Sequence, residues 1–274
     1  MTVVLSEVRE LSLVSKTVAQ EAAGVLMQGY RSRPRADEKS RADLVTEFDR
    51  RSEELVKTRL AALTPEIPVV GEETGGTARP QGLVWYVDPL DGTTNFVHGH
   101  PFFAVAVGLM YNDEPIAGTV IAPVMSFVWR SFRTPSGSGE ALRNEMPCAV
   151  SQVDNFQQAM LGTGFPGNRE VSPDNNFASF FEVKRTAQAV RRCGAAAIDL
   201  CFVGDGTYDG FWERRLHTWD VCAASALVLA AGGKVTAIDG GPIRYHAGYI
   251  CASNGKIHDA LVQTILRGEK KLLP

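Results

Sequence analysis

Apolar residues recur at helical spacing near the start of the chain. In residues 5–28 they occupy positions 11, 14, 18, 22, 25 and 26, which predicts an amphipathic helix that ends at Gly29. A second helix is predicted within residues 44–63. Thr46 can act as its N-cap, and Asp49 stands three residues later, as a capping box requires.

Later segments also favour helices. The stretch 218–231 is almost wholly apolar and is followed by two glycines, which predicts a buried helix with a glycine stop. The segment 259–268 predicts an amphipathic helix near the C-terminus, and a further helix is expected at 173–181. Residues 195–204 are apolar enough for either a helix or a strand.

Continuous apolar runs, in contrast, predict strands that are buried on both faces. The clearest are LVWYV at 83–87 and FFAVAVGLMY at 102–111. Shorter strand-like segments at 115–124 and 126–133 indicate an antiparallel meander. Further strands are expected at 68–76, where the strand runs into a loop, at 158–165 and at 183–192. A charged loop is expected at 31–43, and the segment 135–147 is rich in turn residues.

Composition limits the classes of protein that fit this pattern. The 274 residues are 45% hydrophobic and 22% charged, which is typical of a globular α/β domain or of two lobes sharing a core. No apolar run reaches the roughly 18 residues of a membrane span. The formal net charge of −3 argues against nucleic-acid binding through a basic surface. Five dispersed cysteines without a CxxC pair predict free thiols in a reducing compartment, so we expect a cytoplasmic enzyme.

The strand predicted at 83–87 continues into an unusual sequence, DPLDGTTNF. Asp88, Asp91 and the Leu90 carbonyl can converge on one point, and such oxygen ligands suit a hard cation such as Mg²⁺. A helix that begins at Gly92 and Thr93 would direct free N–H groups to the same place, where they could bind a phosphate. The alternative is an Asp-Gly surface turn, which most such dipeptides form.

Three other acidic motifs have ordinary explanations when each is taken alone. Glu72 and Glu73 follow a short apolar run and could be solvated surface. Asp220, after Trp219, could stabilise the dipole at the start of its helix. The motif DLVTEFD, which ends at Asp49, could be helix capping only.

A glycine-rich segment, GTGFPG at 162–167, literally matches the dinucleotide-binding pattern GxGxxG. Pro166 and the polar, proline-interrupted sequence that follows do not open a helix. Because that pattern binds pyrophosphate only at the start of a helix, we do not expect a dinucleotide site here.

Together, DLVTEFD, GEE, DPLDGTTNF and WD resemble the motifs of the inositol monophosphatase family, within the wider group of metal-dependent, lithium-sensitive sugar-phosphate phosphatases. They occur in the family's order and spacing over roughly residues 36 to 255. The resemblance implies an α/β (α+β layered) fold, an αβαβα sandwich that forms one catalytic domain over 1–274. Two lobes, about 1–150 and 151–274, are compatible with it.

The resemblance also implies a catalytic site with two or three Mg²⁺ ions and a homodimer. The implied metal ligands are Glu72, Asp88, the Leu90 carbonyl, Asp91 and Asp220. Asp88 would bridge two ions, with Glu72 and the Leu90 carbonyl on the first ion and Asp91 and Asp220 on the second.

The implied catalytic residues are Glu72, Thr93 and Asp49. Thr93, oriented by Asp49, would work with Glu72 to position and deprotonate the attacking water. Lys39 resembles the mobile-loop lysine of the family, near a weaker third metal site, and Glu73 lies in the same neighbourhood.

The implied substrate-binding residues are Gly92, Thr93, Gly194, Ala195, Ala196, Glu213 and Asp220. The amides of Gly92 and Thr93 would hold the phosphate. Glu213 matches the position whose carboxylate binds ring hydroxyls of inositol, with a surface acid as its alternative. Ala195 replaces the usual threonine of the family, which bears on substrate preference.

The function expected is Mg²⁺-dependent hydrolysis of a small phosphate monoester, with inositol monophosphate as the first candidate because TTNF at 93–96 favours that branch. Histidinol phosphate and fructose 1,6-bisphosphate are the alternative substrates. A non-catalytic binding or scaffolding protein that keeps the fold is the alternative from another class.

Overall fold

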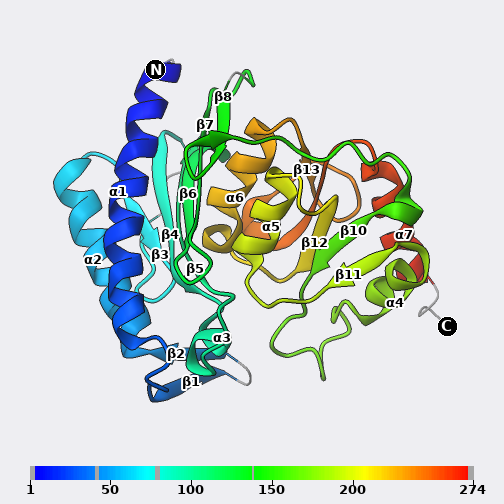
Figure 1. Cartoon of the computed structure of the whole chain (residues 1–274), viewed down its shortest axis with the longest axis horizontal. Coiled ribbons are helices and arrows are strands. Elements are labelled where there is room, and N and C mark those ends of the chain that lie inside the picture. The colour runs from blue at the N-terminus through cyan, green and yellow to red at the C-terminus, as the bar shows by residue number, and fades with distance from the viewer. Residues whose placement is uncertain (1–3, 41–42, 78–80, 138, 271–274) are drawn as a thin grey trace.

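A computed structural model of the chain describes residues 4–40, 43–77, 81–137 and 139–270. Helices and sheets alternate from one side of the molecule to the other in five layers (Figure 1). A helical layer, a large sheet, a central helical layer, a smaller sheet and an outer helical layer follow one another. This arrangement confirms the αβαβα order that the sequence resemblance implies.

The first helical layer consists of α1 (Leu5–Gly29) and α2 (Glu47–Leu63), which pack on one face of the large sheet. The sheet has the strand order β3-β4-β5-β6-β7-β8-β9. Its strands are β3 (Val69–Gly71), β4 (Leu83–Asp91), β5 (Ala104–Tyr111), β6 (Glu114–Ala122), β7 (Phe127–Arg133), β8 (Gly139–Arg143) and β9 (Met146–Pro147). Among the described residues of this sheet, β3 and β4 are the parallel pair and the other neighbours are antiparallel, so the meander predicted from residues 115–124 and 126–133 is confirmed.

The smaller sheet has the order β11-β10-β12-β14-β13 and is built after residue 150. Its strands are β10 (Met160–Thr163), β11 (Ala189–Arg191), β12 (Gly210–Arg214), β13 (Lys234–Thr236) and β14 (Tyr249–Ser253). Helices α4 (Phe177–Thr186) and α7 (His258–Lys270) form the outer layer, whereas α5 (Ala196–Gly204) and α6 (Thr218–Ala230) lie between the two sheets (Figure 1). The short elements are β1 (Ala36–Ser40), β2 (Asp43–Thr46), α3 (Thr93–Val97) and two 3₁₀ turns, Phe156–Gln158 and Tyr245–Ala247.

Most predicted helices are confirmed. The capping box of α2 is present, because the Thr46 side chain accepts from the Phe48 amide and Asp49 accepts from the Thr46 amide. The ambiguous segment 195–204 is helical from Ala196. The reason is tertiary, because α5 is packed between two sheets and has almost no exposed face.

Two local predictions are wrong, and a third is incomplete. The segment 31–43 is not wholly a loop, because residues 36–40 pair with residues 43–46 in an antiparallel hairpin, with residues 41 and 42 outside the described part. The strand expected at 183–192 is reduced to residues 189–191, because α4 continues through Thr186 and packs on α7. The turn-rich segment 135–147 contains β8 and β9, which extend the meander.

Two opposed glycines let the central helix α6 approach the large sheet. Gly108 on β5 and Gly118 on β6 are register partners, and both lie under α6. A Cβ atom at Gly118 would lie 2.5 Å from the Ala223 Cα atom, and one at Gly108 would lie 2.6 Å from the Ala223 nitrogen. Because these contacts are with helix backbone, only glycine permits this spacing, and the spacing determines where the start of α6 lies.

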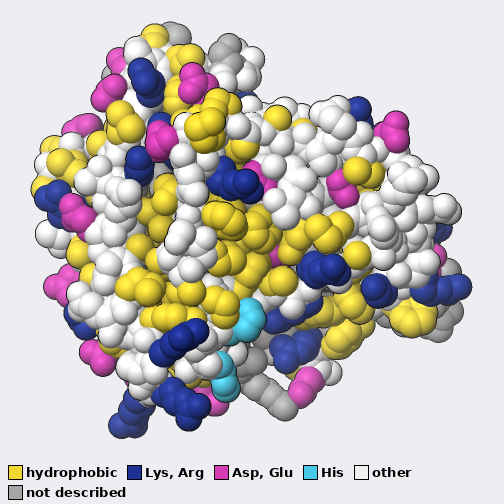
Figure 2. Space-filling view, in the orientation of Figure 1, with side chains coloured by type: hydrophobic (Ala, Val, Ile, Leu, Met, Phe, Trp, Pro, Cys, Tyr) yellow, Lys and Arg dark blue, Asp and Glu magenta, His cyan; other side chains and the backbone are white. Residues whose placement is uncertain are grey.

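On the face in Figure 2, basic and acidic side chains are interspersed, and hydrophobic side chains gather in the middle of the view. Among the helices of the described residues, none has the length and apolar character needed to cross a membrane.

We predict that Gly118→Val lowers the free energy of unfolding by about 2 kcal/mol, because the added side chain must push α6 away from the sheet. Gly24→Ala is the matched control: a Cβ there meets nothing within 4 Å, and alanine in a helix interior should stabilise by about 0.5–1 kcal/mol. Urea unfolding of both variants measures the difference. An unchanged midpoint for Gly118→Val would contradict the close-packing account.

Candidate functional site

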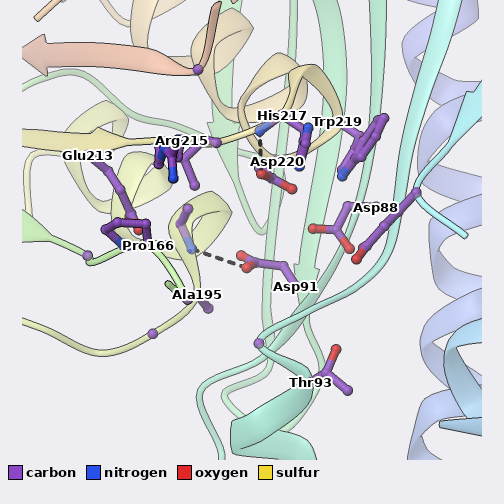
Figure 3. A pocket seen from close by; sticks show the side chains of 18 of the residues that line it. Asp88, Asp91, Thr93, Pro166, Ala195, Glu213, Arg215, His217, Trp219 and Asp220 are labelled. Carbon is purple, nitrogen blue, oxygen red and sulfur yellow. Dashed lines mark hydrogen bonds between the residues drawn. The ribbon is translucent and has the colours of Figure 1, made fainter. Parts of the chain in front are cut away.

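A cavity of about 920 Å³ opens between residues of the segment 39–93 and residues of the segment 164–249. The predicted site residues that line it are Lys39, Glu72, Asp88, Leu90, Asp91, Gly92, Thr93, Gly194, Ala195, Ala196, Glu213 and Asp220. Figure 3 shows Asp88, Asp91 and Asp220, which come from two elements, with their carboxylates turned towards the same space. Asp49 and Glu73 do not line the cavity. They contact residues that do, because Asp49 is bonded to Thr93 and Glu73 to Lys39.

A bulge at the end of β4 brings the first two carboxylates together. Asp88 pairs with Ala106 and Asp91 with Ala104, so the strand contains one residue more than its partner. Pro89 lies in this bulge, where its missing N–H is tolerated. As a result Asp88 and Asp91, which are 2% and 9% exposed, both lie at the floor of the cavity. The surface-turn alternative for DPLDG is therefore excluded.

Gly92 turns the chain sharply from β4 into α3. Its φ of 90° is in the left-handed region, which favours glycine. A Cβ atom there would also lie 3.0 Å from the Phe102 carbonyl oxygen and 3.2 Å from that of Gly194. The turn places Thr93 at the start of α3 and in the wall of the cavity.

Helix N-termini meet two of the carboxylates. Asp91 accepts hydrogen bonds from the amides of Ala196 (3.1 Å) and Ala197 (2.7 Å) at the start of α5. Asp220 lies in the first turn of α6 and accepts from the His217 amide at 2.7 Å. The capping explanation of Asp220 is thus correct, but it is not the whole role, because the same carboxylate borders the cavity.

Glu72 and Glu73 follow β3 and face a lysine from the β1 strand. Lys39 Nζ donates to Glu72 Oε1 at 3.0 Å and to Glu73 Oε1 at 2.5 Å. Burial alone would lower the pKa of Lys39, but the two carboxylates raise it above its usual value. Burial raises the pKa of Glu73 to about 7 despite the hydrogen bond from Lys39.

Thr93 is connected to helix α2 through a buried carboxylate. Its hydroxyl lies 2.9 Å from Asp49 Oδ1 and 3.1 Å from the Leu90 carbonyl oxygen, and it can donate to either. The other oxygen of Asp49 accepts from the amide and the hydroxyl of Thr46. Burial raises the pKa of Asp49, whereas these hydrogen bonds favour its charged form.

The opposite wall of the cavity carries Glu213, on β12. Its carboxylate lies against the backbone of Gly164, where a Cβ atom would come within 2.0 Å of it. The GTGFPG segment begins in β10, and the next helix, α4, begins only at Phe177, so the segment does not open a helix as the dinucleotide-binding pattern does. Burial raises the pKa of Glu213 to about 8, although the positive charge of Arg192 opposes the shift.

The carboxylates at the floor of the cavity repel one another. Burial, with Glu72, Asp91 and Asp220 nearby, holds the pKa of Asp88 well above its usual range, and burial with Glu72 does the same for Asp220. Burial raises the pKa of Asp91 to about 7, even though the α5 amides favour its charged form. Such a cluster of hard oxygen donors requires positive charge, and it fits divalent cations.

Within the described residues, no group of three or more His, Cys, Asp or Glu side chains is arranged so that it could hold a metal ion. The fit to a cation therefore rests on the donor chemistry and on Lys39, whose ammonium group is in hydrogen-bond contact with Glu72. The four carboxylates and the Leu90 carbonyl border one cavity, and they are the donor types that Mg²⁺ prefers.

Several cavity residues were not found from the sequence. Arg192, Arg215, His217 and His246 also line the cavity and make part of its wall basic. His217 stacks on Trp219, with ring centroids 4.6 Å apart. No local pattern distinguishes these residues from surface residues; the sequence signal available for His217 and Trp219 was only their position next to Asp220.

Comparisons with known proteins find similar proteins over most of the chain. The model of the inositol monophosphatase family matches residues 7–270. The chain is 40% identical over 230 residues to an inositol-1-monophosphatase of Synechocystis sp., covering 83% of this chain and 79% of that protein. It is 38% identical over 257 residues to the Nus factor SuhB of Pseudomonas aeruginosa, covering 90% of this chain and 93% of that protein. The solved structure of an inositol monophosphatase from Anabaena (Nostoc) sp. PCC 7120 superposes with a TM-score of 0.86 at 35% identity, covering 95% of this chain and 97% of that one.

We predict that Asp88→Asn raises the melting temperature of the metal-free protein at pH 8. Burial and the neighbouring carboxylates raise the pKa of Asp88 in the folded protein. At a pH above the pKa that Asp88 has in the unfolded chain, its negative charge therefore opposes folding, and asparagine removes that charge. The difference should shrink as the pH falls through the raised pKa of Asp88 in the folded protein, because the wild-type carboxyl group then gains a proton and loses its charge. Thermal melts in a chelator, with exposed Asp154→Asn as the control, measure this.

Adding Mg²⁺ should raise the melting temperature of the wild type and of Asp154→Asn more than that of Asp88→Asn, because ligand binding stabilises the folded state. Equal increases in all three proteins, together with a destabilised Asp88→Asn at pH 8, would contradict the cation-binding role of this cluster.

Proposed function

This chain belongs to the inositol monophosphatase family, and on that premise we propose that its cavity hydrolyses inositol monophosphate or a close polyol phosphate with the help of Mg²⁺. The observation that carries the proposal is the convergence of four carboxylates and a main-chain carbonyl on the turn at Gly92 and Thr93, in one cavity. The family relationship makes the chain a phosphoric monoester hydrolase; the metal, the substrate and the residue roles are the proposal.

The residues that would hold Mg²⁺ are Glu72, Asp88, Asp91, Asp220 and the Leu90 carbonyl. When bound, Mg²⁺ ions would neutralise phosphoryl oxygens, lower the pKa of water and stabilise the leaving ester oxygen. Asp88 would hold cations together with its acidic neighbours, because Glu72, Asp91 and Asp220 all lie near enough to raise its pKa beyond the effect of burial. A third ion near Glu73 and Lys39 is part of the proposal.

The chain's own contribution to the attack centres on Thr93. Its hydroxyl oxygen can accept a proton from the attacking water while it donates its own proton to Asp49. Asp49 is held in place by Thr46 and is ready to receive that proton, because burial has raised its pKa. Glu72 would complete the positioning of the water, and the amides of Gly92 and Thr93 would hold the phosphate.

We assign the choice of substrate to the wall of the cavity that carries Glu213. Glu213, with Gly194, Ala195 and Ala196 beside it, would bind the hydroxyl groups of the alcohol part. Burial raises the pKa of Glu213 to about 8, so at neutral pH its carboxyl group can donate as well as accept a hydrogen bond. Ala195 provides no hydroxyl, which leaves Glu213 with a larger share of the recognition.

Three further properties are proposed on family membership alone. We infer a homodimer, inhibition by Li⁺ and a location in the cytoplasm. The similarity to a protein named as a Nus factor leaves room for a non-catalytic role of the same fold. The intact acidic cluster favours the enzyme, because a binding protein would have no need for carboxylates that repel one another.

The first test is phosphate release from inositol 1-phosphate, histidinol phosphate and fructose 1,6-bisphosphate, with and without Mg²⁺, Li⁺ and a chelator. We expect the highest kcat/KM for inositol 1-phosphate and loss of activity on chelation, because the carboxylates require the ions to hold a phosphate beside them. Full activity in the chelator would contradict the metal-dependent mechanism, and no activity on any substrate would favour the binding protein.

The second test concerns Glu213. Glu213→Gln should reduce kcat/KM for inositol 1-phosphate by about tenfold or more while changing the rate on a small aryl phosphate by less than about twofold, since one lost hydrogen bond to a charged or buried partner is worth about 1.5–3 kcal/mol. Equal losses on both substrates would show that Glu213 supports the chemical step instead of recognition.

A further inference from the structure

We propose that Glu53, on helix α2, is a positioning residue that fixes the turn carrying Glu72, and thereby sets the affinity of the site for Mg²⁺. The inference rests on the function proposed above and extends it to a residue outside the cavity. Neither the sequence motifs nor the cavity lining includes Glu53.

The carboxylate of Glu53 is fully engaged by the two residues that follow Glu72. Its Oε2 accepts from the Glu73 amide at 2.7 Å, and its Oε1 accepts from the Thr74 amide at 2.8 Å and from the Thr74 hydroxyl at 2.5 Å. The residue is 1% exposed. Three donors on one buried carboxylate determine the path of the turn and therefore the direction in which Glu72 leaves it.

The residue before Glu72 is also adapted to Glu53. A Cβ atom at Gly71 would lie 2.4 Å from the Glu53 carboxyl carbon, so only glycine lets the carboxylate sit against the end of β3. The GEET sequence thus has a role for each position: Gly71 provides space, Glu72 faces the cavity, Glu73 donates its amide and Thr74 donates its amide and hydroxyl.

Glu53 belongs to a row of buried polar residues on one face of α2. Asp49, Ser52 and Glu53 are spaced i, i+3 and i+4, so their side chains leave the same side of the helix. Asp49 contacts Thr93, and the Ser52 hydroxyl donates to the Pro89 carbonyl at 3.0 Å, within the DPLD bulge. One rigid helix therefore holds the three segments that supply Thr93, Asp88 with Asp91, and Glu72.

A purely structural role is the competing explanation. Lys57 lies 3.9 Å from Glu53 and donates to the Thr74 hydroxyl oxygen and to the Gly75 carbonyl, so the turn has other attachments. On that explanation, loss of Glu53 lowers stability and leaves cation binding unchanged. On ours, cation binding is lost first, because residues that orient metal ligands typically change metal affinity by about 10–100-fold.

The experiment compares Glu53→Gln with Glu54→Gln, a matched control on the exposed side of the same helix. Glutamine places an NH₂ group opposite one of the turn's N–H donors, so at least one hydrogen bond is lost. Titration calorimetry should show Mg²⁺ binding weakened by about 10–100-fold in Glu53→Gln and unchanged in Glu54→Gln. The Mg²⁺ concentration for half-maximal activity should rise equally, with KM for inositol 1-phosphate at saturating Mg²⁺ within about twofold of the wild type.

A folded Glu53→Gln with wild-type Mg²⁺ binding would overturn the inference, even if its melting temperature were lower. If Glu53→Gln does not fold, the variant Thr74→Val provides the test, because it removes one hydrogen-bond donor to Glu53 at an exposed position. It should weaken Mg²⁺ binding by about tenfold, and unchanged binding would overturn the inference. A wild-type protein that binds Mg²⁺ but hydrolyses no phosphate ester would instead refute the proposed function. The calorimetric comparison of Mg²⁺ binding would still test the role of Glu53.

Discussion

The mutual repulsion of buried carboxylates is the constraint on which the rest of this structure depends. Asp88, Asp91 and Asp220 lie at the floor of one cavity, where burial and the charge of Glu72 raise the pKa of all three, and Asp91 also raises the pKa of Asp88 and Asp220. A fold can keep such groups together only if other parts of the chain favour their charged forms or hold them in place. The amides at the starts of α5 and α6 do this for Asp91 and Asp220, because helix N-termini attract negative charge.

The same requirement explains why backbone and rigid helices, more than flexible side chains, surround the site. Asp91 and Asp220 are held by main-chain N–H groups, and the turn after Glu72 is held by the Glu53 carboxylate. The position of α6 in turn depends on the glycine pair beneath it, Gly108 and Gly118. Because proteins are close-packed, a shift of any of these elements would move a ligand group.

The sequence predicted the elements whose pattern is local. The apolar period of α1, the capping box of α2 and the continuous apolar runs of β4 and β5 depend only on neighbouring residues, and the structure has all of them. The misses have two different causes. The β1 strand is rich in charged residues, which have low strand propensity, yet it pairs with the neighbouring β2 strand, DLVT. Helix α4 is extended by packing on α7, which lies about 80 residues further along the chain. Propensity alone could not show either, because tertiary contacts override it.

By itself, the sequence identified the acidic residues that border the cavity, because the DPLDG, GEE and WD motifs together resemble those of one family, although each motif alone has an ordinary explanation. Only the tertiary structure decided how these carboxylates are held. The hydrogen bond from the Ala197 amide to Asp91 joins residues that are 106 positions apart in the sequence. The hydrogen bond from the Glu73 amide to Glu53 joins residues that are 20 positions apart. No local pattern contains such pairings, because they arise when the layers pack, and packing is also what turns Asp220 from a helix cap into part of a site.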